Sequence, residues 1–337
     1  MTKSEQPGRW RIWLWRLLIG VCVLFAVLCV VPYLYPLSRY DAGKIQPPHD
    51  NGCLRKVSGI NIYSRFWEPS CVVSGNVFLV HGFGSSTYAW EKIMPSLLAS
   101  GFRVVAVDVP GLGYSDKNIT WPYSHGRNAE VLWALADLIA KDRGLPGDTK
   151  WFLVGHSIGG EIVLRMADKR PEKVKQLVLA AGAISGGKPH HLTLIRFPPA
   201  RRWAMVLIEI LLRRSNVMRG ILGSAYGRVP TPEELKGYTA PICVDGTTRA
   251  SFEIGDSHVG LSGSIDMVKN IGVPVSLIWG ENDKWIPTGQ GRRIAKLIGR
   301  PLLLIPGAGH CPMETHPDEF ARILLAEMGS FNSACSN

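Results

Sequence analysis

The sequence predicts an α/β fold in which a mostly parallel central sheet carries helices on both faces, preceded by one membrane-spanning helix. Three observations lead to this prediction. From about residue 57 onward, short apolar runs alternate with stretches of helical periodicity, a pattern typical of parallel strands joined by crossover helices. The runs are apolar almost throughout, as strands buried on both faces are. Ahead of them, the 21 positions from Leu17 to Leu37 carry no charged residue.

Composition limits the class of protein. The chain has 337 residues, of which 46% are hydrophobic and 19% charged, which excludes a disordered chain and allows a substantial core. Lys and Arg outnumber Asp and Glu, giving a net charge of +11. Such a balance suits nucleic acid or anionic lipid, so the position of the cations decides between these. Seven cysteines are too few for a disulfide scaffold, although Cys53 and Cys71 are able to pair in an oxidising compartment.

The amino-terminal segment is predicted to be a retained anchor, because a helix needs about 20 residues to cross a bilayer. Four cations precede the uncharged stretch: Lys3, Arg9, Arg11 and Arg16. Positive flanks stay cytoplasmic, so the rest of the chain is expected on the extracytoplasmic side, be it periplasm, lumen or cell exterior. A cleaved signal peptide is an alternative, but residues 27–38 offer no convincing cleavage site. A buried core helix fits poorly with hydrophobicity on all sides. We expect the tail and anchor over 1–40 and a folded domain over 41–337.

The elements of the folded domain follow in order. Strands are expected at 77–80, 103–107, 151–154, 174–180, 273–279 and 302–305, and helices at about 89–99, 125–142, 158–168, 290–297 and 317–328. The alternation breaks between about residues 184 and 266, a stretch rich in Arg and Pro. We expect this stretch to be an inserted helical cap over the carboxyl edge of the sheet, where α/β proteins bind ligands.

A glycine-rich turn follows the expected strand that ends at Val154. It reads Gly155-His156-Ser157-Ile158-Gly159-Gly160 and opens the next helix. A sharp strand-to-helix turn holds a serine in a strained conformation with its hydroxyl above the sheet. Side chains at the flanking glycines would collide with the neighbouring backbone. In this context the pattern predicts that Ser157 is a nucleophile and not an incidental serine of a turn.

A serine hydroxyl needs a base near neutral pH, and the base needs an orienting carboxylate. Asp283 and His310 each lie on a loop that follows an expected strand, so both belong to the same sheet edge as Ser157. We predict that His310 is the base and Asp283 the orienting acid. Three other acids are weaker alternatives to Asp283: Glu281, which is more typical of a loop cap, and Asp256 and Asp266 in the insertion.

Two backbone N–H groups are expected to form an oxyanion hole. Ile158 follows the nucleophile and supplies one of them. Phe83 supplies the other, from the loop His81-Gly82-Phe83-Gly84 after the first buried strand. His81 directly follows that strand and is interpreted as structural, and His156 as a packing residue.

Together these segments resemble the α/β-hydrolase family, in its capped, esterase-like group. The resemblance rests on the loop at 81–84, the stretch Asp108-Val109-Pro110-Gly111-Leu112-Gly113-Tyr114-Ser115, the turn at Ser157 and the loops at Asp283 and His310. It covers about residues 57–330. It implies a nucleophilic serine, a cap between the sixth and seventh strands and no cofactor. No metal is expected either, because His190, His191 and His258 show no metal-binding spacing. Ser157 argues against the relatives with an aspartate nucleophile, the epoxide hydrolases and haloalkane dehalogenases.

Function is expected to be ester hydrolysis through an acyl-enzyme. Family members with the same triad also cleave carbon–carbon bonds, perform perhydrolysis or transfer acyl groups, and some are slow-turnover receptors, so these remain alternatives. Inside the insertion, six arginines over residues 196–219 flank an apolar core of about ten residues. This is either a cap helix with solvated ends or a lid that dips into a membrane surface. Either suggests a small-molecule or lipid-derived ester as substrate. Nucleic acid is not expected as a partner, because no aromatic platform or recognition helix accompanies the arginines.

Overall fold

The computed structural model describes residues 9–46, 48–118, 120–184, 197–257 and 264–329. The chain forms two compact units. The first consists of residues 1–38 and 190–211, and the second of residues 39–189 and 212–337.

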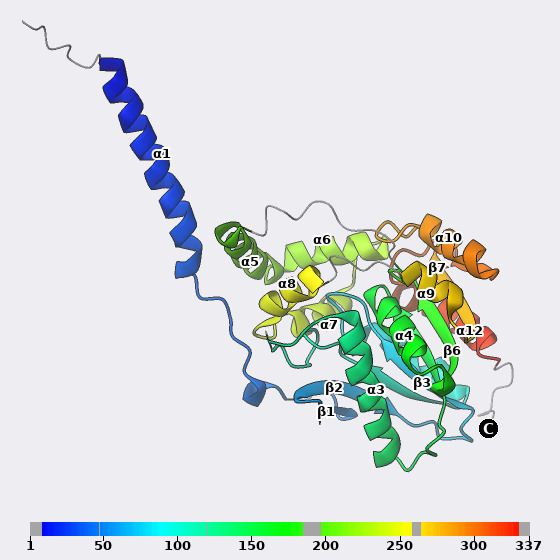
Figure 1. Cartoon of the computed structure of the whole chain (residues 1–337). Helices are drawn as coiled ribbons and strands as arrows, with labels where there is room; N and C mark the ends of the chain where they lie inside the picture. Colours follow the sequence, from blue (N-terminus) through cyan, green and yellow to red (C-terminus); the bar gives the residue numbers. More distant parts are fainter. Residues whose placement is uncertain (1–8, 47, 119, 185–196, 258–263, 330–337) are drawn as a thin grey trace, which may run out of the picture. The chain divides into compact units, whose positions relative to one another are not determined.

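The second unit is built on one eight-stranded sheet with the order β1-β2-β4-β3-β5-β6-β7-β8 (Figure 1). Its strands are β1 (Gly52–Val57), β2 (Ile60–Trp67), β3 (Gly75–Val80), β4 (Phe102–Val107), β5 (Trp151–His156), β6 (Val174–Ala180), β7 (Val275–Gly280) and β8 (Leu302–Ile305). Only β2 runs antiparallel to its neighbours β1 and β4, and the strands from β4 to β8 are parallel. The expected fold class, an α/β-hydrolase fold with a mostly parallel sheet, is confirmed.

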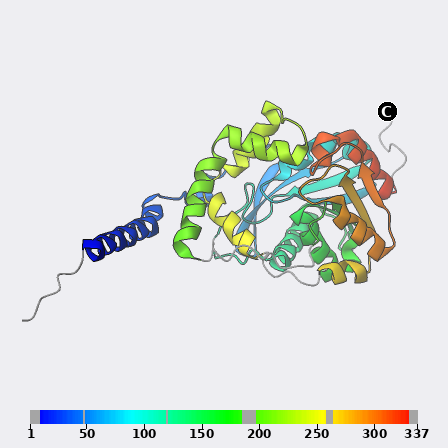
Figure 2. The ribbon, with the colours of Figure 1, turned by 90° about the horizontal axis from the view of Figure 1, so that it is seen from above.

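Two hydrophobic clusters cover the two faces of the sheet, and Figure 2 shows helices on both sides of it. The helices of the first cluster are α3 (His125–Asp142), α4 (Ile158–Lys169), α9 (Ser264–Asn270) and α10 (Thr288–Ile298). The second cluster takes in the 3-10 helix η2 (Thr87–Ile93), α2 (Met94–Ala99), α11 (Pro312–Thr315) and α12 (Pro317–Glu327). The strands from β3 to β7 are therefore shielded from water on both sides over most of their length, which explains why they are mostly apolar.

Helix α3 shows how local sequence sets an element. Its N-cap is Ser124, whose hydroxyl accepts the backbone N–H of Arg127 at 3.2 Å. Its apolar residues recur at helical spacing and are buried against the sheet. The helix ends at Asp142, shortly before Gly144, whose φ of +63° only glycine adopts readily.

The insertion lies between β6 and β7 in the chain. Its helices in the described residues are α5 (Pro198–Leu212), α6 (Ser215–Tyr226), α7 (Pro232–Ile242), α8 (Thr247–Ser257) and α9. Helices α6 and α7 pack on the cluster of η2 and α12, through Leu222, Tyr226 and Tyr238 among others. Helix α8 packs on the opposite cluster through Ala250 and Ile254.

The first unit contains α1 (Arg9–Leu34) and most of α5. In α1 the 25 residues Trp10–Leu34 are long and apolar enough to span a membrane, with a mean hydropathy of 2.8 over the most apolar window. Almost all of its side chains are exposed, unlike those of a helix buried in a core.

The possible pairing of Cys53 with Cys71 is wrong. Cys53 is a free, exposed thiol on the edge strand β1. Its register partner on β2 is Ser64. Cys71 is disulfide-bonded, so nearness in sequence did not identify its partner.

Candidate active site

Ser157 occupies the turn between β5 and α4 in a strained conformation. Its φ of +53° and ψ of −121° lie outside the regions that non-glycine residues favour. The glycines on either side make this turn possible. A Cβ on Gly155 would lie 2.3 Å from the carbonyl oxygen of Gly159, and one on Gly159 would lie 2.3 Å from that of Val80. The turn is fixed by the Ser157 carbonyl, which accepts the N–H groups of Gly160 and Ala183 at 2.9 and 2.8 Å.

His310 and Asp283 form a buried hydrogen-bonded pair. Nδ1 of His310 and Oδ2 of Asp283 are 2.8 Å apart, and both side chains are almost inaccessible to solvent. The other carboxylate oxygen, Oδ1, accepts the backbone N–H groups of Trp285 and Ile286 at 2.8 and 2.9 Å. Asp283 is thereby held by its own loop while it orients the imidazole. Since an ionised carboxylate only accepts, His310 carries its proton on Nδ1 and leaves Nε2 as an acceptor.

The three residues follow the carboxyl ends of β5, β7 and β8, which run parallel. The sheet therefore brings all three to one edge. Among the described residues, the Ser157 hydroxyl makes no hydrogen bond to His310. His156, the residue before Ser157, lies beside His310, with the two ring centroids 4.7 Å apart.

His156 and Trp285 enclose the imidazole of His310. Nε2 of His156 donates to the main-chain carbonyl of His310 at 2.8 Å. Burial, followed by the nearby His310, holds the pKa of His156 well below its ordinary value, so His156 is neutral. The Trp285 ring stacks on that of His310 with centroids 5.4 Å apart, and its indole N–H donates to Ser224 of α6 at 3.1 Å.

The loop after β3 lies close to the serine. A Cβ on Gly82 would lie 3.0 Å from the Cβ of Ser157 and 2.8 Å from Nδ1 of His156. Glycine is therefore needed for this approach. Within the described residues, the backbone N–H groups of Phe83 and Ile158 donate to no other protein group. Phe83 is exposed.

His81 supports this loop from inside the protein. Its Nδ1 donates to the carbonyl of Gly82 at 2.7 Å, and its Nε2 accepts the N–H of Val109 at 3.0 Å. Burial lowers the pKa of His81 to about 4. Both ring nitrogens are thus committed to backbone groups, which agrees with its interpretation as a structural residue.

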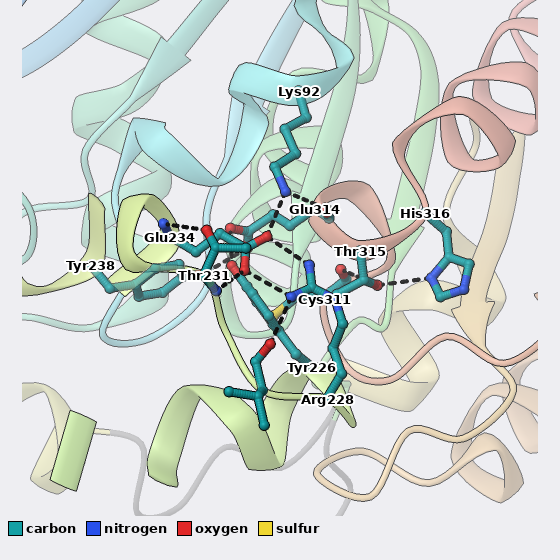
Figure 3. Close-up of polar contacts among 11 residues, drawn as sticks. Lys92, Tyr226, Arg228, Thr231, Glu234, Tyr238, Cys311, Glu314, Thr315 and His316 are labelled. Atoms are coloured by element: carbon teal, nitrogen blue, oxygen red, sulfur yellow. Dashed lines mark hydrogen bonds and ion pairs between the residues drawn. The ribbon is translucent and has the colours of Figure 1, made fainter. Parts of the chain in front are cut away.

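A second polar cluster surrounds Glu314 of α11 (Figure 3). Glu314 of α11 accepts the hydroxyls of Tyr226 and Tyr238, each at 2.6 Å. Lys92 of η2 donates to the main-chain carbonyl of Glu314 at 2.9 Å and to the carboxylate of Glu234 at 2.6 Å. The cluster ties α11, which begins two residues after His310, to the inserted helices α6 and α7 and to η2. Burial raises the pKa of Glu314 to about 7, against the opposing effect of the two tyrosine hydroxyls.

The alternative acids lie elsewhere. Glu281 is exposed and accepts the N–H of Gly307, in the loop that carries His310, at 3.3 Å. Asp256 and Asp266 are exposed on α8 and α9. Among the described residues, no group of three or more His, Cys, Asp or Glu is arranged to hold a metal ion.

Sequence reasoning did not identify the roles of Trp285 and Glu314. Trp285 lies two residues after Asp283, and this nearness to a predicted site residue was the one feature of the sequence that could have indicated it. Glu314 follows His310 by one helical turn, but its partners Tyr226 and Tyr238 are far away in the chain and form no motif with it.

The fold and the arrangement of this edge define an α/β hydrolase. The model of the family described as alpha/beta hydrolase fold matches residues 75–317, and the chain belongs to this family. It is 28% identical over 266 residues to the uncharacterized hydrolase YugF of Bacillus subtilis strain 168, covering 78% of this chain and 92% of that protein.

Two further similarities are to proteins whose names describe different chemistries. The chain is 25% identical over 263 residues to 2-hydroxy-6-oxononadienedioate/2-hydroxy-6-oxononatrienedioate hydrolase 1 of Pseudomonas putida, covering 74% of this chain and 86% of that enzyme. The crystal structure of a bacterial membrane phospholipase A superimposes with a TM-score of 0.65 and 22% identity, covering 95% of this chain and 98% of that one. The class of enzyme common to these proteins is hydrolase.

Proposed function

We propose that the protein is a membrane-anchored serine hydrolase that cleaves carboxylic esters through Ser157, His310 and Asp283. The observation that carries the proposal is a strained serine and a buried His–Asp pair that follow parallel strands at one sheet edge. A serine at such a turn is the nucleophile wherever this arrangement is used for catalysis.

In this proposal Ser157 attacks the ester carbonyl while Nε2 of His310 removes its proton. Asp283 stabilises the imidazolium through the 2.8 Å bond to Nδ1. His310 then protonates the leaving alcohol, and an acyl group remains on Ser157. A water molecule, activated by the same imidazole, attacks the acyl-enzyme and releases the acid.

The negative charge of the tetrahedral intermediate is assigned to the N–H groups of Phe83 and Ile158. Their lack of protein acceptors among the described residues and the proximity of Gly82 to Ser157 support this assignment. Each such donor contributes about 2.7–4 kcal/mol to stabilising the transition state in enzymes where one has been removed.

The substrate is proposed to be an ester of moderate hydrophobicity, either a small molecule or derived from lipid. The membrane phospholipase A, whose structure covers 95% of this chain, supports this class. Carbon–carbon bond hydrolysis is the second candidate, because the Pseudomonas putida relative is named for a 2-hydroxy-6-oxo-dienedioate substrate.

Turnover assays on the full chain in detergent separate these candidates. We expect p-nitrophenyl esters of graded acyl length to be hydrolysed rapidly and a 2-hydroxy-6-oxo-dienoate slowly. Ser157→Ala should abolish labelling by a fluorophosphonate probe, with Ser74→Ala, at an exposed serine before β3, as a control that keeps it. Full labelling of Ser157→Ala would disprove the assignment of the nucleophile. Preferential turnover of the dienoate would replace the ester by the second candidate.

The anchor is proposed to be α1, with the hydrolase unit on the extracytoplasmic side. The 25 apolar residues of α1, the arginines before them and the disulfide at Cys71 support this orientation. Protease added to intact cells or spheroplasts should digest the hydrolase unit. Full protection there, with digestion only after lysis, would contradict the orientation.

A further inference from the structure

Two prolines remove backbone donors from the carboxyl-terminal end of α1. In an α-helix each carbonyl accepts the N–H of the residue four positions later. Leu28 would pair with residue 32 and Pro32 with residue 36, but both of these residues are proline and have no N–H. The Leu28 carbonyl is thus left without its normal donor, and the Pro32 carbonyl, in the last turn of α1, also has none within the helix.

Two consecutive side chains of α5 occupy these carbonyls. The indole N–H of Trp203 donates to the carbonyl of Leu28 at 2.8 Å. Nε of Arg202 donates to the carbonyl of Pro32 at 3.0 Å, and its Nη2 donates to that of Tyr35 at 2.6 Å. In hydrocarbon, where water is absent, an unpaired carbonyl is strongly unfavourable, so these bonds favour a fixed pairing of α5 with α1.

Further contacts extend the pairing along both segments. Phe197, just before α5, stacks on Phe25 with ring centroids 6.4 Å apart. At the other end, Oε1 of Glu209 accepts the backbone N–H of Ser38 at 3.0 Å. Glu209 is the single acid of α5, and it is buried. Its carboxylate is therefore used inside the unit and does not give α5 a charged outer face.

The bond from Trp203 to the Leu28 carbonyl fixes the position of α5 along the axis of α1. Leu28 lies six residues before the end of α1 at Leu34, or about 9 Å along the helix axis at the standard rise. Amphipathic helices at a membrane surface lie about 5–10 Å into the boundary between headgroups and acyl chains. An indole is a typical residue of this boundary.

The outer face of α5 is apolar. Leu207, Ile208 and Leu211 are 50%, 37% and 39% exposed and share one side of the helix by their spacing. Arginines lie at both ends of the helix, at 201–202 and 213–214; of these, Arg202 is bonded to α1 and Arg213 is paired with Asp245 at 3.4 Å. The apolar strip matches the acyl chains of a leaflet. The arginines at its ends match the anionic headgroups.

We propose that α5 lies in the extracytoplasmic leaflet beside α1, held there by Trp203 and Arg202 on the carbonyls that the prolines leave open, and that its outer face binds phospholipid. This deepens the proposed function and rests on α1 being a membrane anchor. Helix α6 begins three residues after α5 ends, and its Ala225 carbonyl accepts the N–H of His310 at 2.7 Å. The hydrolase insertion would thus carry a lipid-binding segment directly attached to a helix of the active site.

Photo-cross-linking of the full chain in nanodiscs tests the inference. A benzophenone amino acid replaces Leu207 on the outer face of α5, Leu24 in the middle of α1, or Val72, which is exposed in the hydrolase unit. The discs contain phosphatidylethanolamine and phosphatidylglycerol. We expect lipid adducts from positions 207 and 24, and only background from position 72.

The outcomes separate the two proposals. Adducts at position 24 with background at 207 would leave the anchor in place and overturn the role of α5. A protein adduct at 207 in place of lipid would also overturn it, by identifying the face as a protein interface. Background at both 24 and 207 would reject the anchor, and the α5 proposal with it.

Substitutions test how α5 is held. Trp203→Phe keeps an aromatic ring but removes the N–H, and should lower the lipid adduct at position 207 several-fold. Trp13→Phe, at the other end of α1, should leave it unchanged. Pro32→Ala gives the Leu28 carbonyl back its normal N–H donor. In that background, Trp203→Phe should lower the lipid adduct at position 207 by a smaller factor. Equal adducts in Trp203→Phe and the parent protein would refute the role of the indole.

Discussion

Asp283 binds His310 through Oδ2 at 2.8 Å while its Oδ1 accepts two backbone N–H groups of its own loop. The two oxygens have different tasks. One fixes the position of the carboxylate, and the other selects the tautomer of the imidazole that leaves Nε2 free to accept a proton. A substitution that preserves the first task and changes the second isolates the contribution of the tautomer.

Asp283→Asn is such a substitution. The asparagine oxygen can keep the bonds from Trp285 and Ile286, but its NH2 group then faces Nδ1 of His310 and places the proton on Nε2. We expect kcat for an ester substrate to fall by about 10⁴-fold, with little change in Tm. Glu281→Gln in the same loop should retain activity, because that carboxylate only caps Gly307. Equal losses in the two variants would show that the loop, and not the tautomer, is responsible.

His156 is predicted to position the loop that carries His310. His156→Leu removes the donor to the His310 carbonyl and leaves that buried group unpaired, which should lower the free energy of unfolding by about 1–3 kcal/mol. His156→Gln places an amide N–H near the same point and should restore part of this loss and of kcat. Because the pKa of His156 is well below its ordinary value, the pH–rate profile of His156→Gln above pH 6 should match that of the parent. Thermal unfolding and pH–rate profiles measure both effects. A lower activity with an unchanged Tm in both variants would argue against a positioning role.

The sequence identified the parts of the site that are encoded locally. The turn at Ser157 depends on glycines within two residues of it, whose neighbours leave no room for a Cβ. The bounds of α3 follow from a serine cap and helical periodicity and were predicted without error. The strand ends that carry Asp283 and His310 were found because parallel strands are recognisable one at a time.

Contacts between distant segments were not predictable in the same way. Trp203 and the Leu28 carbonyl are 175 residues apart in the chain, and neither has a pattern that indicates the other. The buried Glu314 is paired with tyrosines from an insertion that has no repeat or periodic motif. Cys71 was assigned the wrong disulfide partner, Cys53, for a related reason, since bonding depends on the three-dimensional placement of Cβ atoms and not on sequence separation.

Gly159→Ala is predicted to abolish the turn at the nucleophile. The new Cβ would lie 2.3 Å from the carbonyl oxygen of Val80, a distance that requires β3 and α4 to separate. We expect a loss of several degrees in Tm and no measurable fluorophosphonate labelling. Gly126→Ala is the matched control, because nothing lies within 4 Å of its new Cβ in α3. Replacing a helical glycine by alanine there should stabilise the protein by about 0.5–1 kcal/mol. A Gly159→Ala variant that labels like the parent would contradict the packing argument.

Because the carboxyl of Glu314 is buried, we predict that the difference in stability between Glu314→Gln and the parent protein grows with pH. Its pKa is raised from an ordinary 4.5 to about 7, mainly by burial, so between these values the folded protein binds more protons than the unfolded chain. Stability due to this group therefore falls as pH rises from about 4.5 to 7, by about 3 kcal/mol in total. Glu314→Gln keeps an acceptor for one tyrosine and does not ionise. Its Tm should therefore increase relative to that of the parent as the pH rises from 5 to 8. The exposed Glu319, whose pKa is lowered by hydrogen bonding to Arg322, is already ionised over this range, and Glu319→Gln should show a constant difference from the parent. Parallel Tm curves for Glu314→Gln and the parent would mean that Glu314 keeps the same charge throughout, and that its tyrosine partners compensate fully for its burial.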